Sequence, residues 1–311
     1  MDIFLGIDGG GTHTRVVLMD GHEVELGRMV GSASGLDKSS VSASVEEIKT
    51  LCGKVLDGIE CSSISLCAGL AGAGDTVIKK SLESAIQELG ISKDVSVRTD
   101  AEVTFMDAFG LTESGILLIA GTGSTALGRG LNGSKRVGGW GSVIGDEGSG
   151  YRIGLESLRS VIQAQDERMA STSLVYEVLG ALELNAPRDL VTWVSSAEKS
   201  EVAALANLVC HMADAGEEVS SSIVKKAIDD LVIHVQTLLE NLGPWPSAPE
   251  IALHGGLIGP AGPLHDDLIL ALEKLNCDIF KEEIDGARGA CRMAACIQGS
   301  EHNSSNLGGF P

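Results

Sequence analysis

The stretch from Phe4 to Thr14, Phe-Leu-Gly-Ile-Asp-Gly-Gly-Gly-Thr-His-Thr, constrains the fold more than any other part of the chain. An apolar run at 3–7 is typical of a buried strand, and 15–19 is typical of a second strand, so the glycines form a hairpin turn. Three successive glycines cost backbone entropy that a structural role must offset. Glycine lets backbone N–H groups come close to an anion, so the pattern favours a phosphate-binding turn over a hairpin turn without a ligand.

The residues around these glycines have the chemistry that a polyphosphate and its metal ion require. Asp8 ends the first strand, where its carboxylate could hold a hydrated Mg²⁺ ion. Thr12 and Thr14 add hydroxyl donors to the backbone donors of the turn. We therefore predict a metal contact at Asp8 and phosphate contacts at Gly9, Gly10, Gly11, Thr12 and Thr14.

Composition excludes several classes of partner. The net charge of −20 argues against binding to nucleic acid or to an anionic membrane surface, so phosphate would be bound by backbone amides and a metal ion. No apolar run approaches the ~20 residues that a membrane span needs, and a cytoplasmic location is expected. The seven cysteines show no zinc-site spacing. Cys52, Cys61, Cys67 and Cys210 lie in apolar stretches and are interpreted as core residues.

Apolar periodicity predicts alternating strands and helices along the rest of the chain. Strands are expected at 24–30, 64–68, 95–99, 115–120, 126–129, 251–253 and 278–282, and helices at 41–56, 77–89, 101–109, 264–275 and 287–297. Residues 137–154 are expected to form a glycine-rich loop, and 154–242 are mostly helical. The strand, glycine turn and strand at 115–129 repeat the opening pattern, which indicates an internal duplication. Two such α/β halves predict two domains around a ligand-binding cleft.

Two common nucleotide-binding motifs do not fit. The pattern Gly-x4-Gly-Lys-Ser/Thr is absent from the sequence, which excludes a P-loop. Gly121, Gly123 and Ala126 match the dinucleotide pattern Gly-x-Gly-x-x-Gly/Ala, but that motif must open a helix. A strand and a turn are expected here instead, so the dinucleotide interpretation is disfavoured.

Four motifs, taken in order, resemble those of the N-acetylglucosamine kinase and BadF/BadG/BcrA/BcrD ATPase family. They are Asp8–Thr14, Gly121–Ser124, Gly138–Gly141 with Gly145–Ser149, and His254–Gly256. The resemblance extends from Ile3 to about Ala295. The family belongs to the actin, hexokinase and Hsp70 fold group. It therefore implies an α/β protein with two ribonuclease H-like (actin-like ATPase) domains and a nucleotide cleft between the domains.

The resemblance also implies domain limits: an N-terminal domain at 1–112 and a C-terminal domain with a helical insertion at 113–286. A final helix at 287–298 could cross back to the first domain, and the polar tail at 299–311 is expected to be disordered.

The resemblance further implies an ATP- and Mg²⁺-dependent sugar kinase, a phosphotransferase with an alcohol group as acceptor. The second turn would hold the ATP phosphates with Gly121, Thr122, Gly123 and Ser124, and Gly255 and Gly256 would lie against adenosine. Asp100, in Thr-Asp-Ala, would take the proton from the attacked sugar hydroxyl. A helix N-cap is the alternative role for Asp100, and both roles can hold together.

Substrate contacts are implied around the same motifs. They are Ser34, Asp37, Asp100, Thr125, Gly139, Trp140, Asp146 and Glu147, and Asp146 would be a second contact of Mg²⁺. The alternative for Asp146 and Glu147 is a solvated acidic turn. Trp140 could pack on a sugar face or anchor its loop.

The identity of the sugar stays open at this point. N-acetylglucosamine kinases usually carry an Asn in the loop after the third strand and another after the second turn. Here the loop 31–37 has no Asn, and Thr125 occupies the other position. An amino sugar, glucosamine or N-acetylglucosamine, is expected. Another sugar or a sugar acid such as 2-keto-3-deoxygluconate is the alternative, and a homodimer is expected.

Two functions without sugar transfer are also open. A BadF-type ATPase that activates a reductase through an iron–sulfur cluster needs cysteines after the second phosphate motif, and residues 121–154 contain none. A nucleotide-binding regulator without turnover would not need the acidic residues Asp8, Asp100 and Asp146. Both are therefore less favoured than the kinase.

Overall fold

The computed structural model describes residues 2–11, 13–36, 40–298 and 310, grouped in two compact units. Unit 1 comprises residues 1–113 and 281–311, and unit 2 comprises 114–280. Thr12, Asp37 and all of the expected disordered tail at 299–311 except Phe310 lie outside the described residues. Unit 2 thus ends at Phe280, before the limit of 286 expected from the sequence.

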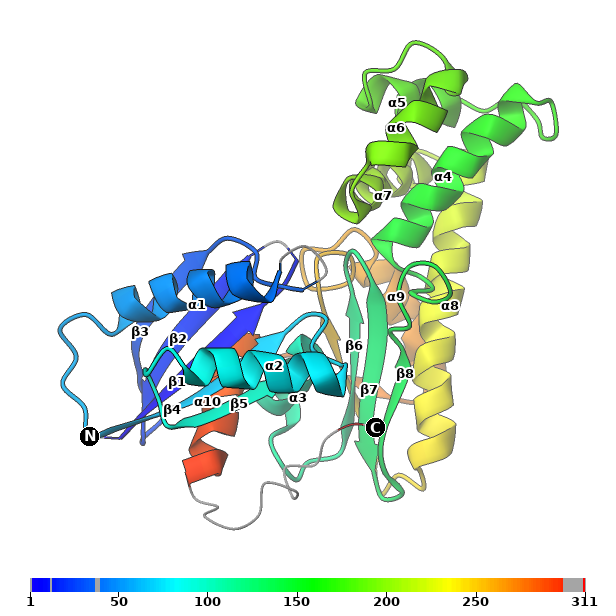
Figure 1. The fold of residues 1–311 in the computed structure, drawn as a ribbon. Coiled ribbons are helices and arrows are strands. Elements are labelled where there is room, and N and C mark those ends of the chain that lie inside the picture. The colour runs from blue at the N-terminus through cyan, green and yellow to red at the C-terminus, as the bar shows by residue number, and fades with distance from the viewer. Residues whose placement is uncertain (1, 12, 37–39, 299–309, 311) are drawn as a thin grey trace. The chain divides into compact units, whose positions relative to one another are not determined.

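Unit 1 is a five-stranded sheet in the order β3-β2-β1-β4-β5 (Figure 1). The strands are β1 (Asp2–Gly9), β2 (Thr14–Asp20), β3 (Glu25–Gly31), β4 (Ser63–Leu70) and β5 (Asp94–Arg98). The first three run antiparallel, and β4 and β5 run parallel to β1. The helices are α1 (Val41–Val55), α2 (Thr76–Gln87), α3 (Asp100–Phe109) and α10 (Gly286–Gln298).

The alternation of side chains along β1 explains why helices cover both faces of this sheet. Ile3, Leu5 and Ile7 point to one face and pack in a core with residues of α1 and α2. Phe4 points to the other face and packs with Val103 of α3 and with the buried side of α10. Since both faces of β1 are covered, this strand is apolar along nearly its whole length.

Unit 2 repeats the topology of unit 1. Its strands are β6 (Gly115–Ala120), β7 (Ser124–Gly130), β8 (Gly133–Gly138), β9 (Glu250–His254) and β10 (Asp278–Ile279), in the order β10-β9-β6-β7-β8. The hairpin strands are antiparallel, and β9 and β10 are the parallel additions. The duplication expected from the two glycine turns is confirmed.

The helices of unit 2 are α4 (Gly150–Gln165), α5 (Leu174–Ala181), α6 (Leu190–Ser196), α7 (Lys199–Asp214), α8 (Glu218–Leu242) and α9 (His265–Leu272). Figure 1 shows α8 running beside the β6–β8 strands and beyond their end, where α4 to α7 gather around it. Among the described residues, the structure contains no helix with the length and apolarity needed to cross a membrane.

Several element limits differ from those expected. Strand β8 was missed because its sequence, Gly-Ser-Lys-Arg-Val-Gly, has little strand character, and only pairing with β7 makes it a strand. The expected loop at 137–154 is therefore shorter, from Gly139 to Ser149. The helix expected at 264–275 ends at Leu272 and continues as a 3₁₀ turn, and β10 ends at Ile279 rather than 282. Cys61 is exposed and is not a core residue.

Candidate active site

Asp8 lies near the end of β1 in a strongly acidic environment. Its side chain is largely buried, and Arg15 Nη1 of β2 lies 3.5 Å from its Oδ2. The pKa of Asp8 is raised from 3.8 to about 7, chiefly by burial and also by the charges of Asp100 and Asp285, while Arg15 opposes the shift. A carboxylate held at this cost is suited to a cation, which would compensate the gathered negative charge.

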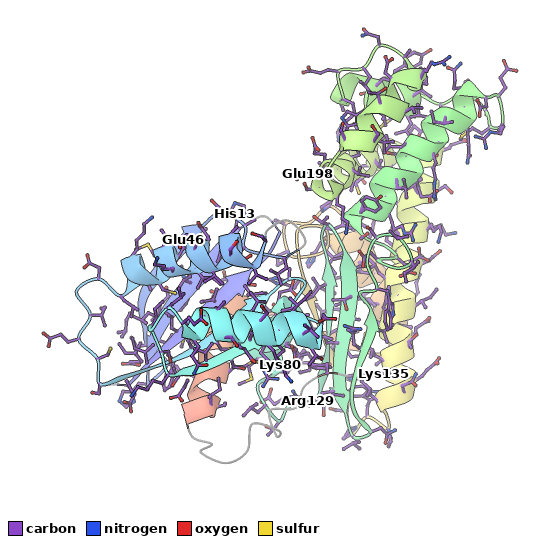
Figure 2. All side chains as sticks on the ribbon, in the orientation of Figure 1. His13, Glu46, Lys80, Arg129, Lys135 and Glu198 are labelled. Atoms are coloured by element: carbon purple, nitrogen blue, oxygen red, sulfur yellow. The ribbon has the colours of Figure 1, made fainter. Side chains whose placement is uncertain are left out.

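The first two glycines after Asp8 differ in the space around them: a side chain would fit at Gly10 but not at Gly9. Among the described residues, a Cβ atom at Gly10 would have the carbonyl oxygen of His13 as its nearest neighbour, at 3.7 Å. A Cβ atom at Gly9 would collide with the Ser34 hydroxyl and would stand 2.5 Å from Leu70. Figure 2 shows His13 at this turn. Gly10 thus faces space that a ligand can fill, whereas Gly9 permits close packing of the protein itself.

Two predicted contact residues in unit 1 have buried hydroxyl groups. The hydroxyl of Thr14 donates to the Ser32 carbonyl (2.5 Å) and lies 2.7 Å from Ser34 Oγ. Neither Thr14 nor Ser34 is exposed to solvent. Both side chains hold the loop after β3 against the hairpin, and their direct contact with phosphate or sugar stays a prediction.

Asp100 is the first residue of α3, and it is not the N-cap. Thr99 is the N-cap: Glu102 donates its backbone N–H to Thr99 Oγ1 (3.2 Å), and Thr99 donates its own to Glu102 Oε2 (2.8 Å). The capping alternative for Asp100 is therefore wrong. The amino end of a helix favours a negative charge, so its position supports an ionised Asp100 carboxylate.

Sequence reasoning missed an ion-pair network that joins α3 to α10. The carboxylate of Asp107 is fully buried and accepts two hydrogen bonds from Arg288, each 2.7 Å long. It also accepts one from Arg292 (3.2 Å) and one from the backbone N–H of Asp285 (2.7 Å). No local signal could reveal it, since Asp107 and Arg288 lie 181 residues apart in the chain.

In unit 2 the second glycine turn lies beside the first turn of α4. The backbone N–H of Gly150 donates to the Gly121 carbonyl (2.8 Å), and that of Tyr151 donates to the Thr122 carbonyl (3.2 Å). A Cβ atom at Gly121 would be 3.7 Å from the backbone nitrogen of Gly256, so the predicted phosphate and adenosine motifs are neighbours. Gly255, with φ of +101°, packs on the carbonyl of Ala120.

The loop 139–149 gathers most of the predicted substrate residues of unit 2. The hydroxyl of Ser124 donates to the Glu147 carbonyl (2.6 Å), and Gly139 donates its N–H to the Ser124 carbonyl (3.0 Å). A Cβ atom at Gly139 would be 2.8 Å from Thr125 Oγ1. Asp146 has a φ of +55° and accepts an N–H from Gly141 (3.2 Å). The loop is thus folded onto the second glycine turn.

Two side chains of this loop, an exposed tryptophan and a partly buried aspartate, differ in chemistry. Trp140 is 66% exposed, and the Arg136 guanidinium lies 5.1 Å from its ring centroid. Burial raises the pKa of Asp146, while Gly141 and Lys199 oppose the shift.

Comparison with known proteins identifies the family of this chain. The model of the BadF/BadG/BcrA/BcrD ATPase family matches residues 5–294. This chain belongs to that family. An N-acetylmuramic acid/N-acetylglucosamine kinase of Clostridium acetobutylicum is 33% identical, and an N-acetyl-D-glucosamine kinase of Dictyostelium discoideum is 32% identical. Each match covers 94% of this chain and 98% of the relative.

Solved structures confirm the expected actin-like ATPase fold. A candidate N-acetylglucosamine kinase of Chromobacterium violaceum superposes with a TM-score of 0.80 at 24% identity, over 94% of this chain and 98% of the other. A ROK-family glucokinase of Streptomyces griseus, solved with glucose and AMPPNP, gives a TM-score of 0.57 at 15% identity, over 96% and 99%. At these identities the likeness concerns the fold.

Proposed function

We propose that this protein is an ATP-dependent kinase that transfers the γ-phosphoryl group to a hydroxyl of an amino sugar. The observation that carries the proposal is the arrangement in unit 1, where the Asp8 carboxylate, the amino end of α3 with Asp100, and the open glycine turn belong to adjoining elements. The names of the curated relatives support an amino-sugar acceptor: two are N-acetylglucosamine kinases and a third is a glucosamine kinase of Vibrio cholerae.

Both glycine turns are proposed to bind the phosphates of ATP. In unit 1 these are Gly9, Gly10, Gly11, Thr12 and Thr14, and in unit 2 they are Gly121, Thr122, Gly123 and Ser124. Gly255 and Gly256 are proposed to lie against adenosine. The open sites at Gly10 and Gly121 support this, because backbone N–H groups there can approach a phosphate.

Asp8 and Asp146 are proposed to contact Mg²⁺, which would neutralise charge on the phosphates during transfer. Mg²⁺ usually takes one or two carboxylates and completes its shell with phosphate and water. This suits the described residues, in which no three His, Cys, Asp or Glu side chains form a metal-binding group.

Asp100 is proposed to be the catalytic base. Its carboxylate would accept the proton of the sugar hydroxyl as that oxygen attacks the γ-phosphorus, and the bond to the ADP oxygen breaks. A base of this kind must be ionised, and the amino end of α3 favours that state.

Sugar contacts are proposed for Thr125, Gly139, Trp140, Asp146 and Glu147 in unit 2, and for Ser34, Asp37 and Asp100 in unit 1. A sugar acid such as 2-keto-3-deoxygluconate stays the alternative substrate, and an ATPase that regulates a protein partner stays the alternative function. The expected homodimer and the cytoplasmic location stay predictions.

The deciding experiment is ADP release from ATP and Mg²⁺ with N-acetylglucosamine, glucosamine, N-acetylmuramic acid, glucose, 2-keto-3-deoxygluconate or no sugar. The proposal predicts strong stimulation by an amino sugar and a phosphorylated product of matching mass. Stimulation by 2-keto-3-deoxygluconate alone would show that the substrate is a sugar acid and not an amino sugar. The same low ADP release with and without sugar would show that the protein is an ATPase and not a sugar kinase, and its iron content would then be measured.

A further inference from the structure

Both ends of the segment 139–147, the main part of the loop 139–149, pack against one face of α8. Gly138 and Gly148 flank this loop with φ of +74° and +75°. A Cβ atom at Gly138 would be 2.6 Å from His234 Nε2, and one at Gly148 would be 2.5 Å from Leu231 Cγ. Positions 231 and 234 lie on the same face of the helix. The loop is therefore attached at two points to one surface, and both points require glycine.

His234 is the polar member of this otherwise apolar surface. It is 5% exposed, and among the described residues Nδ1 has no hydrogen-bond partner. Its Nε2 lies 3.9 Å from Glu147 Oε2, which is too long for a hydrogen bond. Burial lowers the pKa of His234, while Glu147, Asp230 and Asp146 act in the opposite direction. A buried ring nitrogen without a partner costs stability, so packing alone does not explain the choice of this residue.

Glu147 connects this surface to the second glycine turn. Its carbonyl accepts the Ser124 hydroxyl, and the Ser124 carbonyl accepts the Gly139 N–H. The backbone at Glu147 and the start of the loop are therefore linked through one residue of the turn. Lys135 of β8 adds a hydrogen bond to Asn241 of α8 (2.8 Å), which keeps the strand beside the helix (Figure 2).

We propose that His234 is a positioning residue that directs its Nε2–H to Glu147 and so holds the loop 139–147 in the form that contacts the sugar. Hydrogen bonds that are long in a free enzyme often shorten when the substrate is bound. This positioning role of His234 rests on the proposed function, because it assumes that the loop binds a sugar and that His234 affects the affinity for that sugar. His234 itself touches neither substrate nor nucleotide in this proposal.

The test compares two substitutions by steady-state kinetics. His234→Phe keeps a ring and removes both nitrogens, and His234→Gln offers an N–H donor in place of Nε2–H. We expect His234→Phe to raise the KM for the sugar by about tenfold, with kcat and the KM for ATP within about twofold, and His234→Gln to restore it. Glu147→Gln should raise the sugar KM, and the double variant with His234→Phe should have a sugar KM little above that of either single variant. The proposal would be overturned by an unchanged sugar KM in folded His234→Phe, or by a double variant in which the free-energy effects of the two substitutions on the sugar KM add in full.

A second measurement is independent of turnover. Chymotrypsin cleaves after exposed aromatic residues, so its initial rate of cleavage after Trp140 reports on the order of the loop. His234→Phe should speed this cleavage several-fold, and His234→Gln and the control Ile233→Ala, an exposed neighbour on α8, should not. Equal rates in all four proteins would overturn the positioning role. If the wild type phosphorylates no sugar, the proposed function fails, and the cleavage rates still decide the role of His234.

Discussion

Gly286, the first residue of α10, lies directly against the carboxylate of Asp8. A Cβ atom at Gly286 would be 2.8 Å from both Cγ and Oδ2 of Asp8 and 3.2 Å from Thr104 Oγ1. Asp107 fixes α10 in this place through Arg288. The candidate metal ligand of unit 1 is thus supported from the other end of the chain.

This contact predicts the effect of Gly286→Ala. The added methyl group must displace the Asp8 carboxylate, so we expect a loss of at least about tenfold in kcat and a higher Mg²⁺ requirement. Gly53→Ala in α1 is the matched control, because a Cβ atom there meets no atom of the described residues within 4 Å. It should leave activity unchanged and stabilise the protein by about 0.5–1 kcal/mol. Normal Mg²⁺ dependence in Gly286→Ala would contradict the assigned metal contact.

Asp100→Asn should abolish sugar phosphorylation while ATP binding persists. The amide keeps the size of the carboxylate but cannot accept the proton, and we expect kcat to fall by about 10²–10⁴-fold. Isothermal titration with a non-hydrolysable ATP analogue measures the retained binding. Asp75→Asn, at the N-cap of α2, is a matched control that should keep full activity. Normal turnover by Asp100→Asn would show that another group is the base.

Gly10→Val separates a ligand-binding glycine from a packing glycine. Because the space at Gly10 is open, the protein should fold with its melting temperature little changed, and ATP affinity should drop by at least about tenfold. Gly9→Ala should instead lose stability, because its Cβ atom collides with the Ser34 hydroxyl. Thermal melts and nucleotide titration of both variants test this. Unchanged ATP affinity in Gly10→Val would remove the phosphate role of the first turn.

The raised pKa of Asp8 predicts how stability depends on pH. The folded protein favours the protonated form of Asp8. The Asp8 side chain therefore stabilises the fold fully below pH 3.8, and this stabilisation is lost as the pH rises to about 7. Above pH 7 the cost is at most about 4 kcal/mol, since one pKa unit is worth about 1.4 kcal/mol. Asp8→Asn removes the titration. Without Mg²⁺, the variant should therefore be more stable than the wild type at pH 8. This stability difference should be smaller at pH 5.

Urea unfolding of both proteins at pH 5 and pH 8, with Mg²⁺ chelated, measures this difference. A stability difference between wild type and Asp8→Asn that does not change with pH would show that Asp8 is not strained by its neighbours. Addition of Mg²⁺ and ATP should stabilise the wild type and leave Asp8→Asn nearly unaffected.

Local sequence chemistry was sufficient for the hairpins and their glycine turns. The run ending at Asp8 and the repeated run ending at Ala120 are apolar, short and followed by glycines, so they predict a strand and a turn without knowledge of the rest of the fold. The repeated order of such elements also indicated the duplication. These predictions succeeded because strand, turn and helix signals lie within about ten residues of one another.

The tertiary structure alone decided which residues support the site. The pairs Gly286–Asp8, Arg288–Asp107 and His234–Glu147 join residues far apart in the chain, and in each pair at least one partner has no functional signal in its own segment. It also turned the Thr14 hydroxyl inward to the Ser32 carbonyl. Such contacts depend on how helices pack on sheets, and packing energies are summed over side chains that no local pattern brings together.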